Sequence, residues 1–252
     1  MAISEKPLQP LEVKYEHEDY EKLGIMPWFN YLINLPERPL PSNTDRPQIK
    51  TERLLVRPFL PSDAEAFHSL RSVAAIQTHS TTRGRTDHDI QESRDNIEKF
   101  QSEDQHHWYF GAFLQSTGEL IGEGGLPDLD GWRSGRPEGE ILIKPGYQRQ
   151  GYGTELWKAV TETYWELPRE KRRYQLCPAF VSAEKEPGDE VADAIGFVWE
   201  DTNTAARRFF GKLLGQASLE AAGFFVDYDR REGREGNLVR WEGTLAGNPR
   251  GE

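Results

Sequence analysis

Hydrophobic and polar positions change period along the chain, and each change predicts the boundary of a strand or a helix. Residues 53–59 (RLLVRPF) alternate with the two-residue period of a strand. Residues 62–65 (SDAE) form a capping box, and Phe67, Leu70 and Ala74 follow at helical spacing. A first strand is therefore expected to lead into a first helix.

The middle of the chain predicts a second helix and then three strands. Apolar residues at helical spacing mark the helix over residues 90–100. Apolar runs at residues 108–114 and 120–126 flank a turn in which Gly118 can supply a positive φ. A longer loop follows, and a fourth strand begins at about Glu140. Such consecutive strands are typical of an antiparallel half-sheet.

The second half predicts two more helices and three more strands. A helical pattern runs to residue 167, and a strand is expected at residues 194–199. Asn203 is the predicted N-cap of a last helix, which strands at residues 223–226 and 238–245 follow. The whole pattern predicts an α+β fold in which about four helices flank a mixed, mostly antiparallel, twisted sheet of about seven strands.

Three segments lie outside this regular pattern. Residues 1–50 form an extension whose apolar island at residues 25–33 we expect to pack on the domain, near the substrate entrance. The domain itself is expected at residues 51–246. It contains a charged stretch at about residues 168–190, interpreted as an irregular, solvated insertion. Residues 247–252 are expected to form a tail.

Composition narrows the class of protein. The 252 residues carry a net charge of −11, which opposes binding to nucleic acid and favours a cationic partner such as an amine. No run approaches the ~20 apolar residues of a membrane span, and the first residues lack a secretory signal, so we expect a cytoplasmic protein, with nuclear residence not excluded. The single cysteine, Cys177, allows no internal disulfide, and no metal site is expected.

One stretch combines an apolar strand with a glycine-bearing loop and a helix. Residues 139–154 read GEILIKPGYQRQGYGT, and the helical pattern follows directly. The first amides of a helix lack intrahelical partners and lie at the positive end of its dipole, so such a junction binds anions. Gly151 and Gly153 let the backbone turn sharply and approach a phosphate. A plain tight turn is the alternative interpretation.

The motifs of this stretch resemble those of the GNAT acyltransferase superfamily. Gln148, Gly151 and Gly153 match the Q/R-x-x-G-x-G/A loop that binds the pyrophosphate of coenzyme A in that family. Residues 139–143 (GEILI) are similar to its fourth strand, and residues 201–206 (DTNTAA) to the entry of its next helix.

The entry TERLLVRP at residues 51–58 is similar to the branch that includes ribosomal-protein N-terminal acetyltransferases. The resemblance covers roughly residues 51–245. It implies a sheet that splays between its fourth and fifth strands, with acetyl-CoA as cosubstrate. The residues that it assigns to the cofactor are Leu142, Ile143, Lys144, Gln148, Arg149, Gln150, Gly151, Tyr152, Gly153, Thr154, Asn203 and Ala206.

Acyl transfer to an amine needs a base, a polarised carbonyl and a fixed geometry. Glu140 is the candidate general base, acting through water, because several GNAT enzymes have a glutamate at this place. A structural pairing of Glu140 with an arginine or lysine across the sheet is the alternative. Many relatives have a tyrosine after the asparagine as general acid, but Phe209 and Phe210 stand there in this chain.

The acceptor is expected to be an amine-bearing small molecule, peptide or protein. His79 and Arg83, in the polar segment of residues 77–89, are candidate contacts because that region helps to form the acceptor site in the family. Trp28, in the N-terminal island, is a third candidate. The alternative for the polar segment is an ordinary solvated loop. The protein is expected to be a monomer or a homodimer.

Two other functions are alternatives to acetyl transfer. A GNAT-fold protein that binds CoA or acyl-CoA without turnover, as a sensor or scaffold, fits the missing tyrosine. A dinucleotide-binding oxidoreductase would need a third glycine three residues after Gly153, where Leu156 stands instead.

Overall fold

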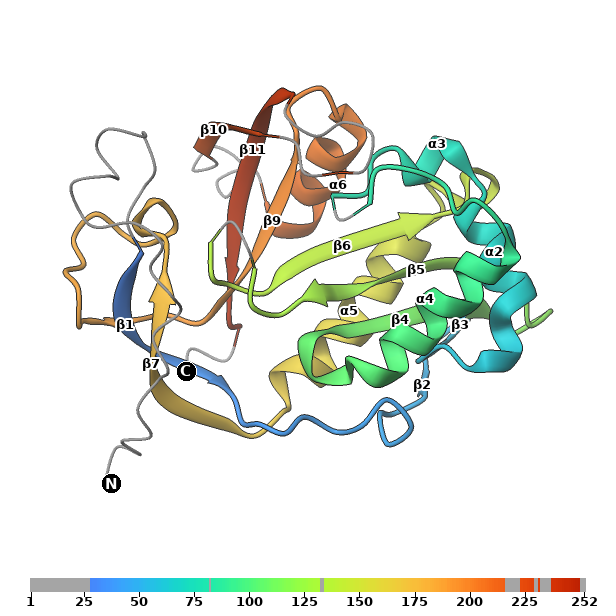
Figure 1. Ribbon diagram of the computed structural model, residues 1–252, viewed down its shortest axis with the longest axis horizontal. Helices are drawn as coiled ribbons and strands as arrows, with labels where there is room; N and C mark the ends of the chain where they lie inside the picture. The colour runs from blue at the N-terminus through green and yellow to red at the C-terminus, as the bar shows by residue number, and fades with distance from the viewer. Residues whose placement is uncertain are drawn as a thin grey trace.

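Eight strands form the main sheet of the computed structural model, in the order β10-β11-β9-β6-β5-β4-β3-β2 (Figure 1). The structure describes residues 28–81, 83–131, 134–215, 223–228, 231 and 237–249. The strands of this sheet are β2 (Ile49–Lys50), β3 (Leu54–Arg57), β4 (Trp108–Leu114), β5 (Leu120–Asp128), β6 (Glu138–Ile143), β9 (Ala194–Glu200), β10 (Gly223–Tyr228) and β11 (Leu238–Gly247). All neighbours pair antiparallel except β6 and β9.

Helices cover both faces of this sheet. α2 (Ala64–Arg71) and α4 (Ile90–Ser102) pack on one face and α5 (Tyr152–Trp165) on the other, while the short α3 (Ala74–Gln77) lies against β6 (Figure 1). α6 (Thr204–Leu214) follows β9. Single 3-10 turns are η1 (Pro61–Asp63), η2 (Asp104–His106), η3 (Pro145–Tyr147) and η4 (Pro178–Phe180). The alternation in β4 explains the two layers, because Trp108 and Phe110 join the core under α5 whereas Tyr109 joins the core under α2 and α4.

The sheet splits between β6 and β9. These parallel strands pair only at Glu138 and Gly196, near the start of each strand. Beyond that pair the two strands diverge, so the side of β6 that faces β9 has unpaired backbone groups. The predicted α+β fold and its splay between the fourth and fifth strands of the domain are confirmed; the short α3 is one helix more than the pattern indicates.

A second, three-stranded sheet stands beside the main one (Figure 1). It consists of β1 (Phe29–Pro36), β7 (Arg169–Leu176) and β8 (Glu190–Val191), in the order β7-β1-β8. Its own apolar cluster contains Tyr31, Ile33, Leu35, Leu176 and Val191. The described part of the N-terminal extension therefore packs through a strand, while residues 1–27 lie outside the described residues.

The expectation of an irregular insertion at residues 168–190 is wrong for its first part, which is β7. β7 pairs with β1 along eight positions, from Phe29↔Leu176 to Pro36↔Arg169. Charged side chains on this strand find partners: Lys171 pairs with Glu190, and the buried Arg169 pairs with Asp193. The charged residues of β7 form ion pairs with residues outside the strand, so the strand does not need alternating apolar residues. Its sequence therefore resembles that of a loop.

Candidate active site

A cavity of about 740 Å³ occupies the split between β6 and β9. Its walls come from β6, the loop before α5, the end of β9, α6, and the region of α3. The lining residues include most of the residues expected from the sequence: Glu140, Leu142, Ile143, Gln148, Arg149, Gly151, Gly153, Thr154, Asn203, Ala206 and His79.

The loop before α5 lines this cavity and leads into the N-terminus of that helix. Gly151 is the N-cap of α5 and has a φ of 90°, a left-handed conformation that favours glycine. Because the cap has no side chain, no side-chain acceptor competes for the amides of the first helical turn. Arg149 also has a positive φ, 62°. The loop thus has the geometry of an anion site.

Three cations line the cavity near this loop. Arg149 comes from the loop itself, while Arg208 and Lys212 come from α6. Among the described residues, none of the three is paired with a carboxylate. Gln148 has a structural role as well, because its Nε2 donates to the carbonyl of Ile143 at 2.8 Å and closes the turn between β6 and the loop. The donor set fits a pyrophosphate.

Three of the expected cofactor residues do not line the cavity. The ring of Tyr152 lies under the guanidinium of Arg53, 4.1 Å from its centroid. The carbonyl of Gln150 accepts a hydrogen bond from Arg53 Nη1 at 2.9 Å. Lys144 pairs with Glu119 at 3.4 Å. Tyr152 and Gln150 thus connect the loop to Arg53 on its outer side.

Glu140 lies in the wall of the cavity and is 8% exposed. Its Oε1 accepts hydrogen bonds from Ser80 Oγ and from the Thr81 amide, both at 2.9 Å. Its Oε2 accepts one from the Tyr109 hydroxyl at 3.3 Å. No arginine or lysine in the described part of the chain forms an ion pair with Glu140. The partners found for this carboxylate are therefore neutral donors, and the expected alternative of a cation across the sheet is not observed there.

Tyr109 reaches Glu140 because a glycine separates them. Gly125 pairs with Tyr109 on one side and with Glu140 on the other, so no side chain stands between the two. Burial raises the pKa of Tyr109 well above its usual value, and Glu123 and Glu140 act in the same direction. The phenol consequently stays protonated and can donate to the carboxylate.

A second buried carboxylate lies behind Glu140. Glu123 is fully buried and pairs with Arg71 at 2.9 Å. Burial raises the pKa of Glu123, Arg71 lowers it, and Glu140 raises it further. This ion pair lies outside the lining of the cavity.

α6 forms the opposite wall. Asn203 Oδ1 accepts from the amide of Ala206 at 3.0 Å, so the expected cap is present and the residue also faces the cavity. Phe209 lines the cavity, and a Cβ on Gly153 would lie 3.3 Å from its Cε2. Phe210 packs with Phe197 and Trp199 in the core. Neither phenylalanine can donate a proton.

The three acceptor candidates are in different places. His79 is exposed and lines the cavity. Arg83 does not line it, because its guanidinium pairs with Asp87 at 2.9 Å and with Glu92 at 2.8 Å. Trp28 lies against Gly135 beside the small sheet, and it is not among the lining residues. The structure brings only His79 together with Glu140.

The sequence interpretation missed several residues of this site. Ser80 and Thr81 lie in a polar segment without periodicity, and Tyr109 lies in an apolar run that indicates only a strand. Trp199 and Val198 line the cavity as well as belonging to the apolar pattern of β9. For Tyr109, the glycines at 124 and 125 on the next strand were the available signal, since a glycine in a strand often marks a close approach.

No helix among the described residues is long and apolar enough to span a membrane. Within the same residues, no group of three or more histidine, cysteine, aspartate or glutamate side chains is arranged to hold a metal ion.

Comparison with known protein families gives one match. Residues 53–214 match the family model described as the acetyltransferase (GNAT) domain. The matched residues make up more than half of the chain. No curated protein matches the chain.

Three of the solved structures with similar folds are bacterial acetyltransferases. A GNAT-family acetyltransferase from Bacillus anthracis is 16% identical, with a TM-score of 0.52 over 79% of this chain and 98% of its own. A putative ribosomal-protein-serine acetyltransferase from Vibrio cholerae is 17% identical, with a TM-score of 0.50 over 79% and 97%. A ribosomal-protein-S5-alanine acetyltransferase from Vibrio fischeri is 11% identical, with a TM-score of 0.54 over 82% and 100%. At these identities the likeness concerns the fold.

Proposed function

The chain belongs to the GNAT acetyltransferase family, and from this premise we propose that it transfers an acetyl group from acetyl-CoA to a primary amine of a small molecule, peptide or protein. The observation that carries the proposal is that a single cavity joins an anion-binding loop to a buried carboxylate. Arg149, Gly151 and Gly153 of the loop line that cavity, and so does Glu140.

The loop suits the pyrophosphate of acetyl-CoA. The amides of the first turn of α5 would bind its oxygens, and Arg149, Arg208 and Lys212 would offset its charge. The free edge of β6 beyond Glu138 supplies unpaired backbone groups along which the pantetheine arm would lie as an added strand. Asn203 and Ala206 contribute the facing wall.

The charges along the cavity favour a cationic acceptor. Its cations come from the loop and from α6, whereas the α3 side contributes Glu140, Thr81 and the exposed His79. Arg83 and Arg85, in the segment after α3, both form ion pairs with Glu92. An amine that arrives as an ammonium would thus meet the carboxylate of Glu140 rather than an unpaired guanidinium.

The reaction would follow direct attack within a ternary complex. Glu140, acting through water, takes a proton from the ammonium, and the nitrogen lone pair then forms a bond with the thioester carbonyl carbon. The nitrogen of the tetrahedral adduct gives up its second proton to water, and collapse of the adduct then breaks the C–S bond and leaves the amide and the CoA thiolate. Because a thiol is a modest acid, the thiolate can leave without a general acid and then take up a proton from water. Departure of the thiolate without a general acid is consistent with Phe209, which lines the cavity where many relatives have a tyrosine.

Thiol release tests the proposal directly. The purified protein would be incubated with acetyl-CoA and a panel of monoamines, polyamines and peptides with free N-termini, and free CoA thiol would be measured. Amine-dependent release with formation of the acetylated amine is expected. Tight binding of CoA, measured by calorimetry, without release across the panel would instead support the non-catalytic sensor or scaffold.

A further inference from the structure

A single loop places two hydrogen-bond donors on the candidate base. The α3–α4 loop, residues 78–89, runs from the end of α3 to the start of α4, with residue 82 outside the described residues. Ser80 Oγ and the Thr81 amide both donate to Glu140 Oε1, across 60 positions of sequence in the case of Ser80. Ser80 is fully buried. The orientation of this carboxylate therefore depends on the position of the loop.

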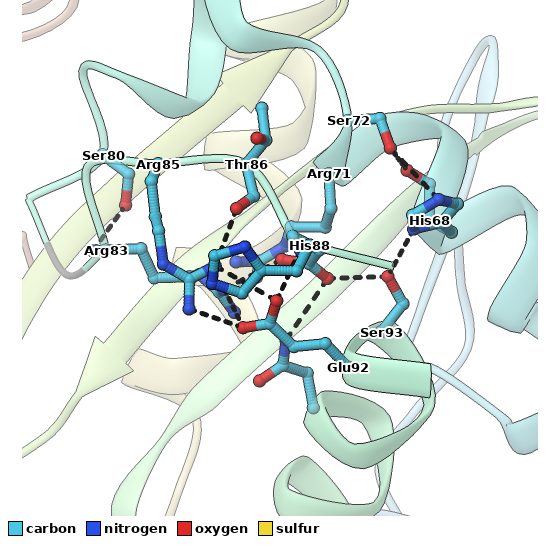
Figure 2. Close-up of polar contacts among 12 residues, drawn as sticks. His68, Arg71, Ser72, Ser80, Arg83, Arg85, Thr86, His88, Glu92 and Ser93 are labelled. Carbon is cyan, nitrogen blue, oxygen red and sulfur yellow. Dashed lines mark hydrogen bonds and ion pairs between the residues drawn. The ribbon is translucent and has the colours of Figure 1, made fainter. Parts of the chain in front are cut away.

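The Ser80 hydroxyl also accepts a hydrogen bond from within its own loop. The amide of Arg83 donates to Ser80 Oγ at 3.2 Å (Figure 2). A hydroxyl has one proton to give and accepts through its lone pairs. Since the Arg83 amide occupies an acceptor position, the Ser80 proton is available for Glu140. Ser80 thus links the backbone of the loop to one oxygen of Glu140.

Glu92 holds the loop from the first turn of α4. Its carboxylate pairs with Arg83 at 2.8 Å and with Arg85 at 2.7 Å, and it accepts from the His88 amide at 2.6 Å (Figure 2). We call Glu92, Arg83 and Arg85 the latch. Hydrogen bonding from Arg85, together with His88 and Arg83, lowers the pKa of Glu92 to about 2, against the opposing effect of burial.

Asp87 supports the same loop from inside. This buried carboxylate pairs with Arg83 and accepts from Ser93 Oγ at 2.7 Å on α4. Its amide donates to the carbonyl of Arg71 at the end of α2. The loop is consequently fastened to two helices, and its position does not depend on contact with an acceptor.

We propose that Ser80 is a positioning residue for Glu140, and that the latch of Glu92 with Arg83 and Arg85 holds Ser80 in place. The inference rests on the proposed function, because it assigns Ser80 a role only through the base. A carboxylate that rotates freely spends little time in the geometry for proton transfer, whereas one bound at both oxygens is pre-organised. Ser80 and Thr81 fix Oε1 and Tyr109 fixes Oε2, which leaves the remaining lone pairs for water or the amine.

This assignment changes the role of Arg83. Its place in the polar segment suggests an acceptor contact, but its guanidinium pairs with Asp87. It also pairs with Glu92 (Figure 2). Arg83 would act on turnover through Ser80 rather than by touching the acceptor.

A double-mutant cycle separates positioning from general stability. Ser80→Ala would be compared with Glu140→Gln and with the double variant, with kcat and the KM for acetyl-CoA measured for each. Ser80→Ala alone is expected to lower kcat about ten- to a hundredfold while leaving the KM for acetyl-CoA unchanged. In the Glu140→Gln background the same substitution is expected to have no further effect, because the group that it positions is gone. Equal effects in both backgrounds would overturn the proposal.

The latch is tested by Glu92→Gln with Glu98→Gln as the matched control. Both residues lie on α4, and Glu98 is exposed, with a carboxylate that forms no ion pair or hydrogen bond within the described part of the chain. Glu92→Gln is expected to lower kcat at least fivefold with CoA affinity unchanged, and Glu98→Gln to leave both unchanged. A folded Glu92→Gln variant with parental kcat would show that the latch does not act on the base.

The two proposals fail in different ways. A parent protein that releases no thiol with any amine overturns the proposed function, and the positioning role with it. A parent that turns over, but whose kcat survives Ser80→Ala, overturns the positioning role alone. Thermal unfolding and CoA binding of every variant identify any loss that comes from misfolding.

Discussion

Arg53 binds both carboxylate oxygens of Glu155, with its backbone amide on Oε1 at 2.9 Å and its Nε on Oε2 at 2.8 Å. The contact joins the chain just before β3 to the first turn of α5. Arg53 Nη1 also donates to the carbonyl of Gln150. The loop before α5 is thus held from its outer side by a residue that does not line the cavity.

The first prediction follows from this contact. Arg53→Ala should raise the KM for acetyl-CoA by roughly threefold to tenfold with little change in kcat, because it loosens the loop without touching the base. The effect is modest since the Arg53 side chain is 37% exposed and solvent screens the pair. Glu190→Gln, which removes the exposed pair with Lys171 in the small sheet, is the control. Steady-state kinetics with varied acetyl-CoA measures both, and an unchanged KM for Arg53→Ala would contradict the prediction.

The second prediction concerns Gly151. Gly151→Ala should weaken CoA binding at least tenfold, because a Cβ at a φ of 90° is strained by about 1–2 kcal/mol and the loop relaxes away from its anion-binding shape. Gly188→Ala provides a matched control: its φ is 97°, and no atom lies within 4 Å of its added Cβ. Calorimetry with CoA should show loss of affinity only for the first variant, although both lose similar stability. Equal affinities would remove the loop as the pyrophosphate site.

The third prediction tests Glu140 itself. Glu140→Gln should lower kcat by about 10²–10³ at neutral pH, since an amide cannot accept the ammonium proton, while CoA affinity stays the same. Glu138→Gln, the neighbouring carboxylate on β6, is the comparison. A folded Glu140→Gln variant with parental kcat would exclude Glu140 as the base.

Local sequence was sufficient for the elements that local chemistry determines. The loop at residues 148–154 was found because its glycines, its strand and its helix are contiguous, and Asn203 because a cap acts on the next turn. The seven predicted strands were found along the chain by the same kind of evidence, because each has its own apolar pattern, while their order in the sheet comes from the structure.

Contacts between residues that lie far apart in the sequence could not be predicted from local patterns. β7 forms a strand by pairing with β1, whose residues lie more than 130 positions earlier in the chain. No pattern within residues 169–176 predicts that pairing. Ser80 reached Glu140 for a similar reason: a loop without periodicity indicates nothing about where it folds back. Arg83 was taken for an acceptor contact because an arginine in a polar loop is ambiguous until Glu92 is placed beside it.

A buried histidine outside the lining of the cavity gives the last prediction, which concerns stability. His107 is 4% exposed; its Nε2 donates to the carbonyl of Phe100 at 2.7 Å, and its Nδ1 faces Arg46 Nη1 at 3.2 Å. Burial, followed by the charge of Arg46, lowers the pKa of His107 from 6.5 to about 4. Between pH 6.5 and about 4, His107 therefore binds more protons in the unfolded chain than in the native state.

The contribution of His107 to the free energy of unfolding is accordingly fully present above pH 6.5. It is lost as the pH falls toward 4, by up to about 3 kcal/mol. His107→Gln keeps a donor for Phe100 but does not titrate, so its free energy of unfolding should vary less with pH across this window. Urea unfolding at half-unit steps from pH 4 to 7 measures the slope for both proteins. His106→Gln, at the neighbouring exposed position, should keep the parental slope, and a His107→Gln variant with that same slope would show that another group carries the acid sensitivity.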